Sequence, residues 1–113
     1  MTTLINLLQN LPNRLDQEQV DVLVRQAAIR IERIVSTGQA SPPGFWYDQP
    51  EQEWVVLLSG RARIELRDPR ETRELIAGDQ LLIAAHRPHR VIGTAADQPT
   101  VWLAVFFPVD EPA

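Results

Sequence analysis

The sequence predicts an all-β domain whose short strands form a sandwich or a barrel. Turn-forming Gly, Pro and Asp residues recur at short intervals from Gly38 to Pro108, so the segments between them are too short for ordinary helices. The segment RARIELR, residues 61–67, alternates apolar and charged residues with the period of a strand that has one buried face. Many short strands separated by polar turns are typical of all-β sandwiches and barrels.

The first 26 residues differ from the rest of the chain. In TLINLLQNLP and LDQEQVDVLVRQ, Leu and Val recur at helix-like spacings, and Asp16 and Glu18 stand where the start of a helix favours acidic residues. We therefore expect two short helices around Pro12. This N-terminal helical segment, residues 1–26, is expected to pack on the barrel or on a partner subunit, and residues 27–113 are expected to form the β-barrel.

After this segment the apolar residues recur with a period of two. Residues 27–35 place Ile29, Ile31 and Val35 on one face of a strand, and Arg30 and Glu32 on the other. Both faces of the last apolar run, TVWLAVFF at residues 100–107, are hydrophobic, so we expect one of them to be covered by the N-terminal helices or by a second subunit. The further strands are expected in EWVVLLSG (53–60), RARIELR (61–67), QLLIAA (80–85) and TVWLAVFF (100–107).

Composition and charge argue against several functional classes. The chain has 113 residues and a formal net charge of −4, which fits a single domain and gives no reason to expect nucleic acid or an anionic membrane as a partner. It contains no Lys and no Cys, so Schiff-base and thiol chemistry are excluded. The N-terminal MTTLINLLQN has neither a basic region nor a long apolar run, and we therefore expect a cytoplasmic protein without a signal peptide or a membrane span.

Two stretches of the chain resemble the motifs of the cupin family. Glu53 is followed after six residues by Gly60 and an alternating strand, as in the second half of the first cupin motif. The stretch GDQLLIAAHRPHRV resembles the second motif, with Gly78 and His89 at its glycine and histidine positions. This resemblance covers roughly residues 27–107. The stretches GFWYDQ, EWVVLLSG and HRV are similar to those of small single-domain bacterial cupins. It implies a double-stranded β-helix, or jelly-roll barrel, behind the short N-terminal helical segment.

The first motif departs from the family pattern, because its paired histidines are absent. Tyr47 and Gln49 stand at the two histidine positions with one spacing, and Trp46 and Asp48 with the other. Of the metal ligands in this motif only the glutamate, Glu53, is retained, together with the glycine, Gly60.

The resemblance nevertheless implies a divalent metal site for manganese, iron, nickel or zinc, held by Glu53 and His89 with His86 or Asp48 as a further ligand. His86 lies three residues from His89, so it faces the opposite side of a regular strand, although a kink at Pro88 would turn it inward. The alternative for Asp48 is a solvated charge in a turn. On the metal hypothesis, the chain performs dioxygenase- or isomerase-like chemistry on a small polar metabolite.

A metal-free pocket is the alternative interpretation. Tyr47 and Gln49 share a face, and Arg87 lies two residues from His89, so these side chains would hold a small anionic or sugar-like ligand without catalysis. A third hypothesis is that the barrel serves mainly in oligomerisation, with the pocket filled by its own side chains. The sequence leaves open whether the protein is an enzyme. We expect a small-molecule ligand and a homodimer.

Overall fold

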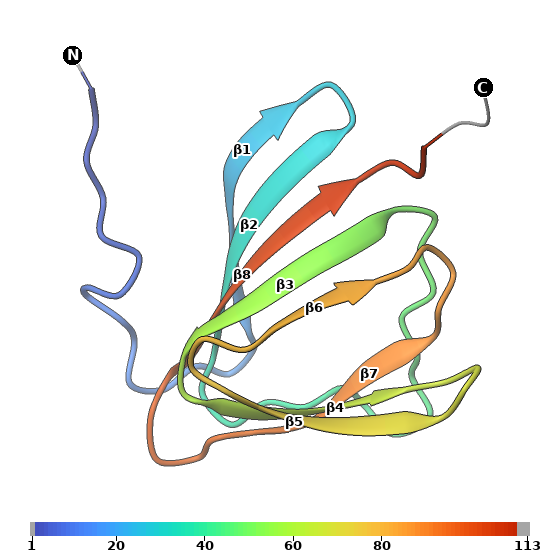
Figure 1. Cartoon of the computed structure of the whole chain (residues 1–113). Coiled ribbons are helices and arrows are strands. Elements are labelled where there is room, and N and C mark those ends of the chain that lie inside the picture. Colours follow the sequence, from blue (N-terminus) through green and yellow to red (C-terminus); the bar gives the residue numbers. More distant parts are fainter. Residues whose placement is uncertain (1, 111–113) are drawn as a thin grey trace.

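The computed structural model describes residues 2–110, which form eight strands and no helix (Figure 1). It therefore contains no helix long and apolar enough to cross a membrane within these residues. The strands are β1 (Gln19–Gln26), β2 (Ile29–Ser36), β3 (Gln52–Ser59), β4 (Arg61–Leu66), β5 (Glu71–Ile76), β6 (Gln80–Ile83), β7 (His89–Thr94) and β8 (Thr100–Phe107).

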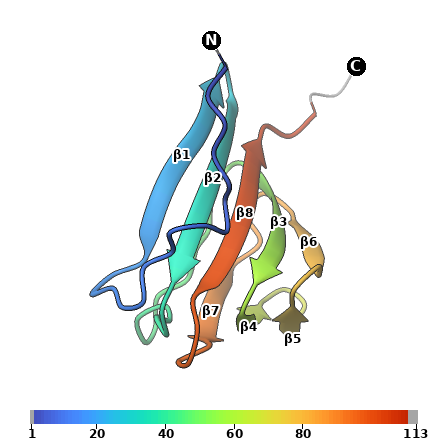
Figure 2. The same ribbon diagram turned by 90° about the vertical axis from the view of Figure 1, so that its left-hand side faces the viewer.

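The strands form two antiparallel sheets that face each other (Figures 1 and 2). The larger sheet has the order β1-β2-β8-β3-β6, and the smaller has the order β5-β4-β7. Strands that are distant in the sequence are neighbours in both sheets, as β8 is between β2 and β3. This arrangement confirms the predicted all-β jelly-roll barrel.

The hydrophobic core lies between the two sheets. Alternation directs every second residue of each strand inward, and the inward residues of β3, β4 and β8 are the most completely buried. The buried members of this core are Val55, Leu57, Ala62, Ile64, Leu66, Leu75, Ile83, Trp102, Ala104 and Phe106.

The predicted N-terminal helices are wrong. Residues 2–18 have no regular structure, and residues 19–26 form β1, which pairs with β2 along its whole length. The valines of the segment QVDVLVRQ prefer a strand, and its backbone pairs with β2. The helix expected from this segment would be too short to be stable by itself. The Leu7 carbonyl accepts a hydrogen bond from Arg33 Nη1, and the Leu15 amide donates to Thr37 Oγ1. These bonds hold the irregular segment along the outer face of the larger sheet (Figure 2).

Candidate functional site

A pocket of about 280 Å³ opens between the two sheets. Its volume lies near the lower end of the range of small-molecule sites, so it suits a small ligand. The wall contains aliphatic residues together with Trp102 and Phe106, and the polar side chains that line it are Glu18, Arg30, Glu32, Tyr47, Gln49, Glu53 and His89.

Three of these polar side chains form one connected cluster. Glu53 in β3 and His89 in β7 are buried, at 9% and 6% exposure, and face each other from opposite sheets. His89 Nε2 lies 3.4 Å from Glu53 Oε1, and the side-chain amide of Gln49 donates to the same oxygen at 3.1 Å. The carboxylate of Glu53 is therefore held by two neighbours, one of which is ionisable.

The protonation of His89 follows from its two contacts. Nδ1 lies 2.9 Å from the carbonyl oxygen of Arg87, which only accepts, so Nδ1 carries a proton. Nε2 faces a carboxylate oxygen, which also favours a proton there. Burial lowers the pKa of His89, but the interaction with Glu53, the bond to the Arg87 carbonyl and the charges of Glu53 and Asp48 outweigh burial, so the pKa is raised. The cluster thus favours an imidazolium beside a carboxylate.

Tyr47 completes this side of the pocket. Its backbone forms a two-way bridge with His89, with N···O distances of 2.7 and 3.0 Å, and its ring stacks on the imidazole with the ring centres 5.5 Å apart. Burial raises the pKa of Tyr47, and the charges of Glu18 and Glu53 act in the same direction. The phenol therefore stays neutral and keeps a hydroxyl group that both donates and accepts.

His86 and Asp48, the two further metal ligands expected from the sequence, lie outside this cluster. The chain turns at His86, whose φ is 59°, and both side chains are more than half exposed. His86 Nδ1 lies 2.8 Å from Asp48 Oδ1, so the two residues pair with each other on the surface.

Arg87 also lies outside the pocket. Strand β7 begins only at His89, so the alternation that was expected to bring Arg87 to the same face does not extend back to it. Its guanidinium instead donates to the carbonyl oxygens of Arg67 and Pro69 and pairs with Glu71. Of the three residues expected to bind a ligand, the structure brings Tyr47 and Gln49 to His89 and Glu53, and places Arg87 elsewhere.

Three charged residues of the pocket were missed by the sequence analysis. Arg30 and Glu32 share the inward face of β2 with Ile34, and Glu18 precedes β1. Arg30 pairs with Glu32 at 2.8 Å and with Glu51 at 3.3 Å, and its guanidinium carbon lies 4.1 Å from the centre of the Phe106 ring. One feature of the sequence could have revealed this arrangement. Arg33 is a charged residue on the face of this strand that carries Ile29 and Ile31, and that face is otherwise apolar.

The donor set of the pocket does not fit a metal site of the kind that the family resemblance implies. Such a site needs several imidazoles and a carboxylate converging on one point. The pocket offers one imidazole, His89, beside the carboxylate of Glu53, whose Oε1 already accepts from Gln49, and the carboxylates of Glu18 and Glu32 elsewhere in its wall. No group of three or more His, Cys, Asp or Glu side chains within residues 2–110 is placed to hold a metal ion. The metal-ligand roles of Glu53, His89, His86 and Asp48 stay a prediction.

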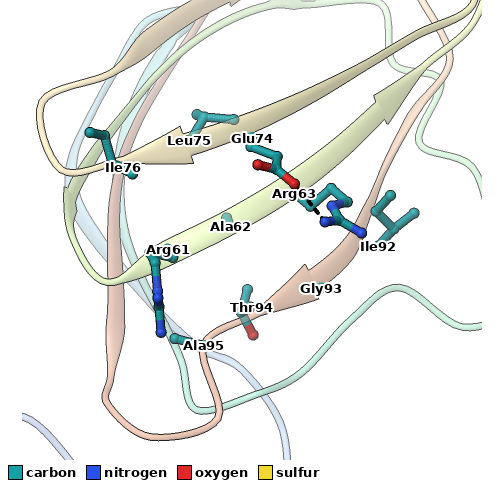
Figure 3. A pocket seen from close by; sticks show the side chains of 10 residues that line it. All are labelled: Arg61, Ala62, Arg63, Glu74, Leu75, Ile76, Ile92, Gly93, Thr94 and Ala95. Carbon is teal, nitrogen blue, oxygen red and sulfur yellow. Dashed lines mark hydrogen bonds and ion pairs between the residues drawn. The ribbon is translucent and has the colours of Figure 1, made fainter.

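A second hollow of about 390 Å³ lies on the smaller sheet (Figure 3). Arg63 and Glu74 form an ion pair across its wall, and Arg61 pairs with Asp97. Each charged side chain that lines this hollow thus has a partner of opposite charge.

Comparisons with known proteins agree with this architecture. The family profile described as a cupin domain matches residues 33–106. A crystal structure from Ralstonia eutropha JMP134, named as a putative mannose-6-phosphate isomerase, is 44% identical with a TM-score of 0.92, and the match covers 96% of this chain and 100% of that one.

More distant solved structures share the fold alone. A conserved protein of unknown function from Streptococcus pyogenes is 22% identical with a TM-score of 0.75, over 98% of this chain and 91% of that one. The iron(II) complex of HppE with its substrate is 14% identical with a TM-score of 0.67, over 87% of this chain and 58% of that one. No curated protein matches the chain.

Proposed function

Because the chain belongs to the cupin family, we propose that its barrel pocket binds a small, neutral, hydroxyl-rich metabolite such as a sugar. The observation that carries this proposal is the cluster of Gln49 with the buried side chains of Glu53 and His89, and Tyr47 stacked against His89. These side chains present donors and acceptors side by side, as the hydroxyl groups of a sugar require.

The charges around the pocket support a neutral ligand over an anion. Glu18, Glu32 and Glu53 line the wall, while the cationic groups that residues 2–110 contribute to it are Arg30 and protonated His89. Arg30 is already paired with two glutamates. A phosphate or carboxylate in this pocket would therefore meet more negative than positive charge.

The relative from Ralstonia bears the name of an enzyme for a sugar phosphate. The pocket of the present chain suits the sugar part of such a molecule, with Trp102 and Tyr47 as flat apolar surfaces for its ring. A phosphate group would have to lie away from the three glutamates.

A metal-dependent enzyme is the second candidate function, and one observation favours it. The carbonyl of Arg87 fixes Nδ1 of His89 and leaves Nε2 directed at Glu53. Metal-bound histidines are commonly oriented by such a second contact. Within residues 2–110 no third His, Cys, Asp or Glu side chain is grouped with these two to hold a metal, so we rank this function below metal-free binding.

A thermal-shift screen of neutral sugars, sugar phosphates and small carboxylates tests the proposal. A ligand that binds only the folded state raises the melting temperature, so at least one neutral sugar should give a saturable increase. Glu53→Gln should weaken the binding of that sugar about tenfold, because it removes a charged hydrogen-bond acceptor. Arg87→Ala is the control, since Arg87 lies outside the pocket and should leave the affinity unchanged.

Two outcomes would contradict this assignment. If only anionic compounds raise the melting temperature, and Arg87→Ala abolishes their effect, the ligand class is wrong. If manganese, iron, nickel or zinc gives a saturable increase that is lost in His89→Gln, the metal-dependent function replaces the proposed one.

A further inference from the structure

Two arginines converge on Trp46 on the outer side of the smaller sheet. The guanidinium carbon of Arg67 lies 4.8 Å from the centre of the Trp46 ring, and that of Arg90 lies 5.7 Å from it. Trp46 and Arg90 point outward because of strand alternation. Their chain neighbours, Tyr47 and His89, point into the pocket. The arginine cluster therefore lies on the other side of the wall from the barrel pocket.

These two arginines differ from most others in having no carboxylate partner among residues 2–110. Seven of the eleven arginines form ion pairs there, and Arg67 and Arg90 are not among them. Arg90 Nε is buried without any hydrogen-bond partner, and Arg90 Nη2 has only a 3.4 Å bond to the carbonyl of Ser41. Apart from the buried Nε and the bonded Nη2 of Arg90, the guanidinium N–H groups of these two side chains thus have no hydrogen-bond partner among residues 2–110.

A hollow of about 310 Å³ adjoins the cluster and is lined by Trp46, Arg67, Asp68, Pro69 and Arg70. Arg70 binds Glu65 through Nε and Nη2, so it screens the nearest carboxylate on β4. The remaining carboxylate in the wall is Asp68. Positive charge therefore predominates locally in a chain whose overall charge is −4.

The geometry of the Trp46 contacts leaves the arginines free to bind an anion. A guanidinium interacts with an aromatic ring through its flat face, whereas it binds an oxyanion through the N–H groups along its edge. Trp46 restricts both side chains through contacts at 4.8 and 5.7 Å and accepts no hydrogen bond from them, and this reduces the entropy that a ligand must remove.

We propose that Arg67 and Arg90, held by Trp46, form a second ligand site that binds the phosphate or carboxylate group of a small molecule. The site is separate from the barrel pocket and independent of the function proposed for it. It also places anion binding at a position other than Arg87, whose guanidinium is already paired with Glu71.

An NMR titration of the intact protein with inorganic phosphate, with acetate and with chloride, each at constant ionic strength, tests this site. Phosphate or acetate should shift the indole N–H signal of Trp46 saturably and leave those of Trp54 and Trp102 in place, while chloride should have no effect. Arg67→Gln and Arg90→Gln should each weaken binding about tenfold, because each removes a charged donor.

Arg63→Gln is the matched control, because Arg63 lies on β4, four residues before Arg67, is exposed and is paired with Glu74. It should leave the affinity unchanged. The site is refuted if neither phosphate nor acetate gives a saturable shift, or if Arg63→Gln weakens binding as much as Arg67→Gln. The latter result would mean that the anions respond only to the general charge of the surface.

Discussion

The charge of the pocket depends on the proton of His89. This ring lies between a carboxylate and a backbone carbonyl, and both contacts favour the imidazolium form over the effect of burial. The folded protein therefore holds this proton more tightly than the unfolded chain does. A ligand hydroxyl that enters the pocket meets an acceptor at Glu53, because both nitrogens of His89 already face acceptors in the protein.

This raised pKa predicts how stability depends on pH. A group whose pKa is higher in the folded state stabilises it fully below the ordinary value, which is 6.5 for His89. That contribution is lost as the pH rises through the raised pKa. Urea unfolding at a series of pH values should therefore show a stability difference between the wild type and His89→Gln that is largest at low pH and decreases above 6.5. A difference that is constant or grows with pH would contradict the assigned protonation.

At the scale of single residues, the sequence predicted the residues around His89 in the pocket but not the charged residues that β2 and the start of β1 contribute to its wall. Motif spacing was sufficient for Glu53, His89, Tyr47 and Gln49, which lie on or beside regular strands. Arg87 was misplaced because alternation holds only within a strand, and β7 begins two residues later. Arg30 and its neighbours were missed because a charged face usually points to solvent, and only the tertiary structure shows that this one lines a cavity.

Among the connections between elements, the β3–β4 turn is the tightest. Gly60 has a φ of 87°, and a Cβ atom added there would lie 2.3 Å from Thr100 Oγ1 and 2.6 Å from Thr100 Cα. Thr100 is fully buried, and its Cα belongs to the backbone of β8. The absence of a side chain at Gly60 thus lets β8 pass directly beside the turn.

Gly60→Ala should therefore destabilise the protein by about 3 kcal/mol or more, from the sum of backbone strain and the clash with β8. Gly78→Ala is the matched control, because its φ is 96° but nothing lies within 4 Å of the added Cβ. It should cost only the backbone penalty of about 1–2 kcal/mol. Urea unfolding of both variants measures the difference, and equal losses would show that the contact with Thr100 is relieved by a small shift.

Elements were predicted well where one strand face is buried and poorly where it is not. The expected strands at 53–60, 61–67, 80–85 and 100–107 all correspond to observed strands. Strand β5 was not predicted, because most of its residues are exposed and its sequence ETRELI lacks a clear apolar alternation. The N-terminal helices were predicted from spacing alone, whereas pairing with β2 decided the conformation of residues 19–26.

On the scale of the whole molecule, the outer face of the larger sheet carries an apolar row that crosses all five strands. Val24, Ile31, Val105, Trp54 and Leu82 are successive cross-strand partners in the register of the sheet. Each lies on the side opposite the pocket. Val24 and Leu82 are 44% and 58% exposed, so the row is not covered at its ends.

The N-terminal segment adds to this apolar surface. It runs along the same face of the sheet (Figure 2), yet Leu4, Ile5 and Leu8 are themselves exposed. The row contains no charged residue, so two copies could face each other about a twofold axis without like-charge repulsion. Because both faces of residues 100–107 are apolar, this outer face requires a cover, and we propose that a second copy of the chain provides it.

This homodimer should be visible by sedimentation at high micromolar protein concentration. Leu82→Glu should raise the dimer dissociation constant about thirtyfold, which is about 2 kcal/mol, because it places a carboxylate in an apolar interface. Since Leu82 is largely exposed in the single chain, the same change should leave the unfolding of the monomer almost unaffected. Ile76→Glu is the control, because Ile76 has a similar exposure of 61% and belongs to the smaller sheet. A monomeric wild type would exclude this face as the interface between two copies of the chain. So would equal effects of the two variants on the dimer dissociation constant.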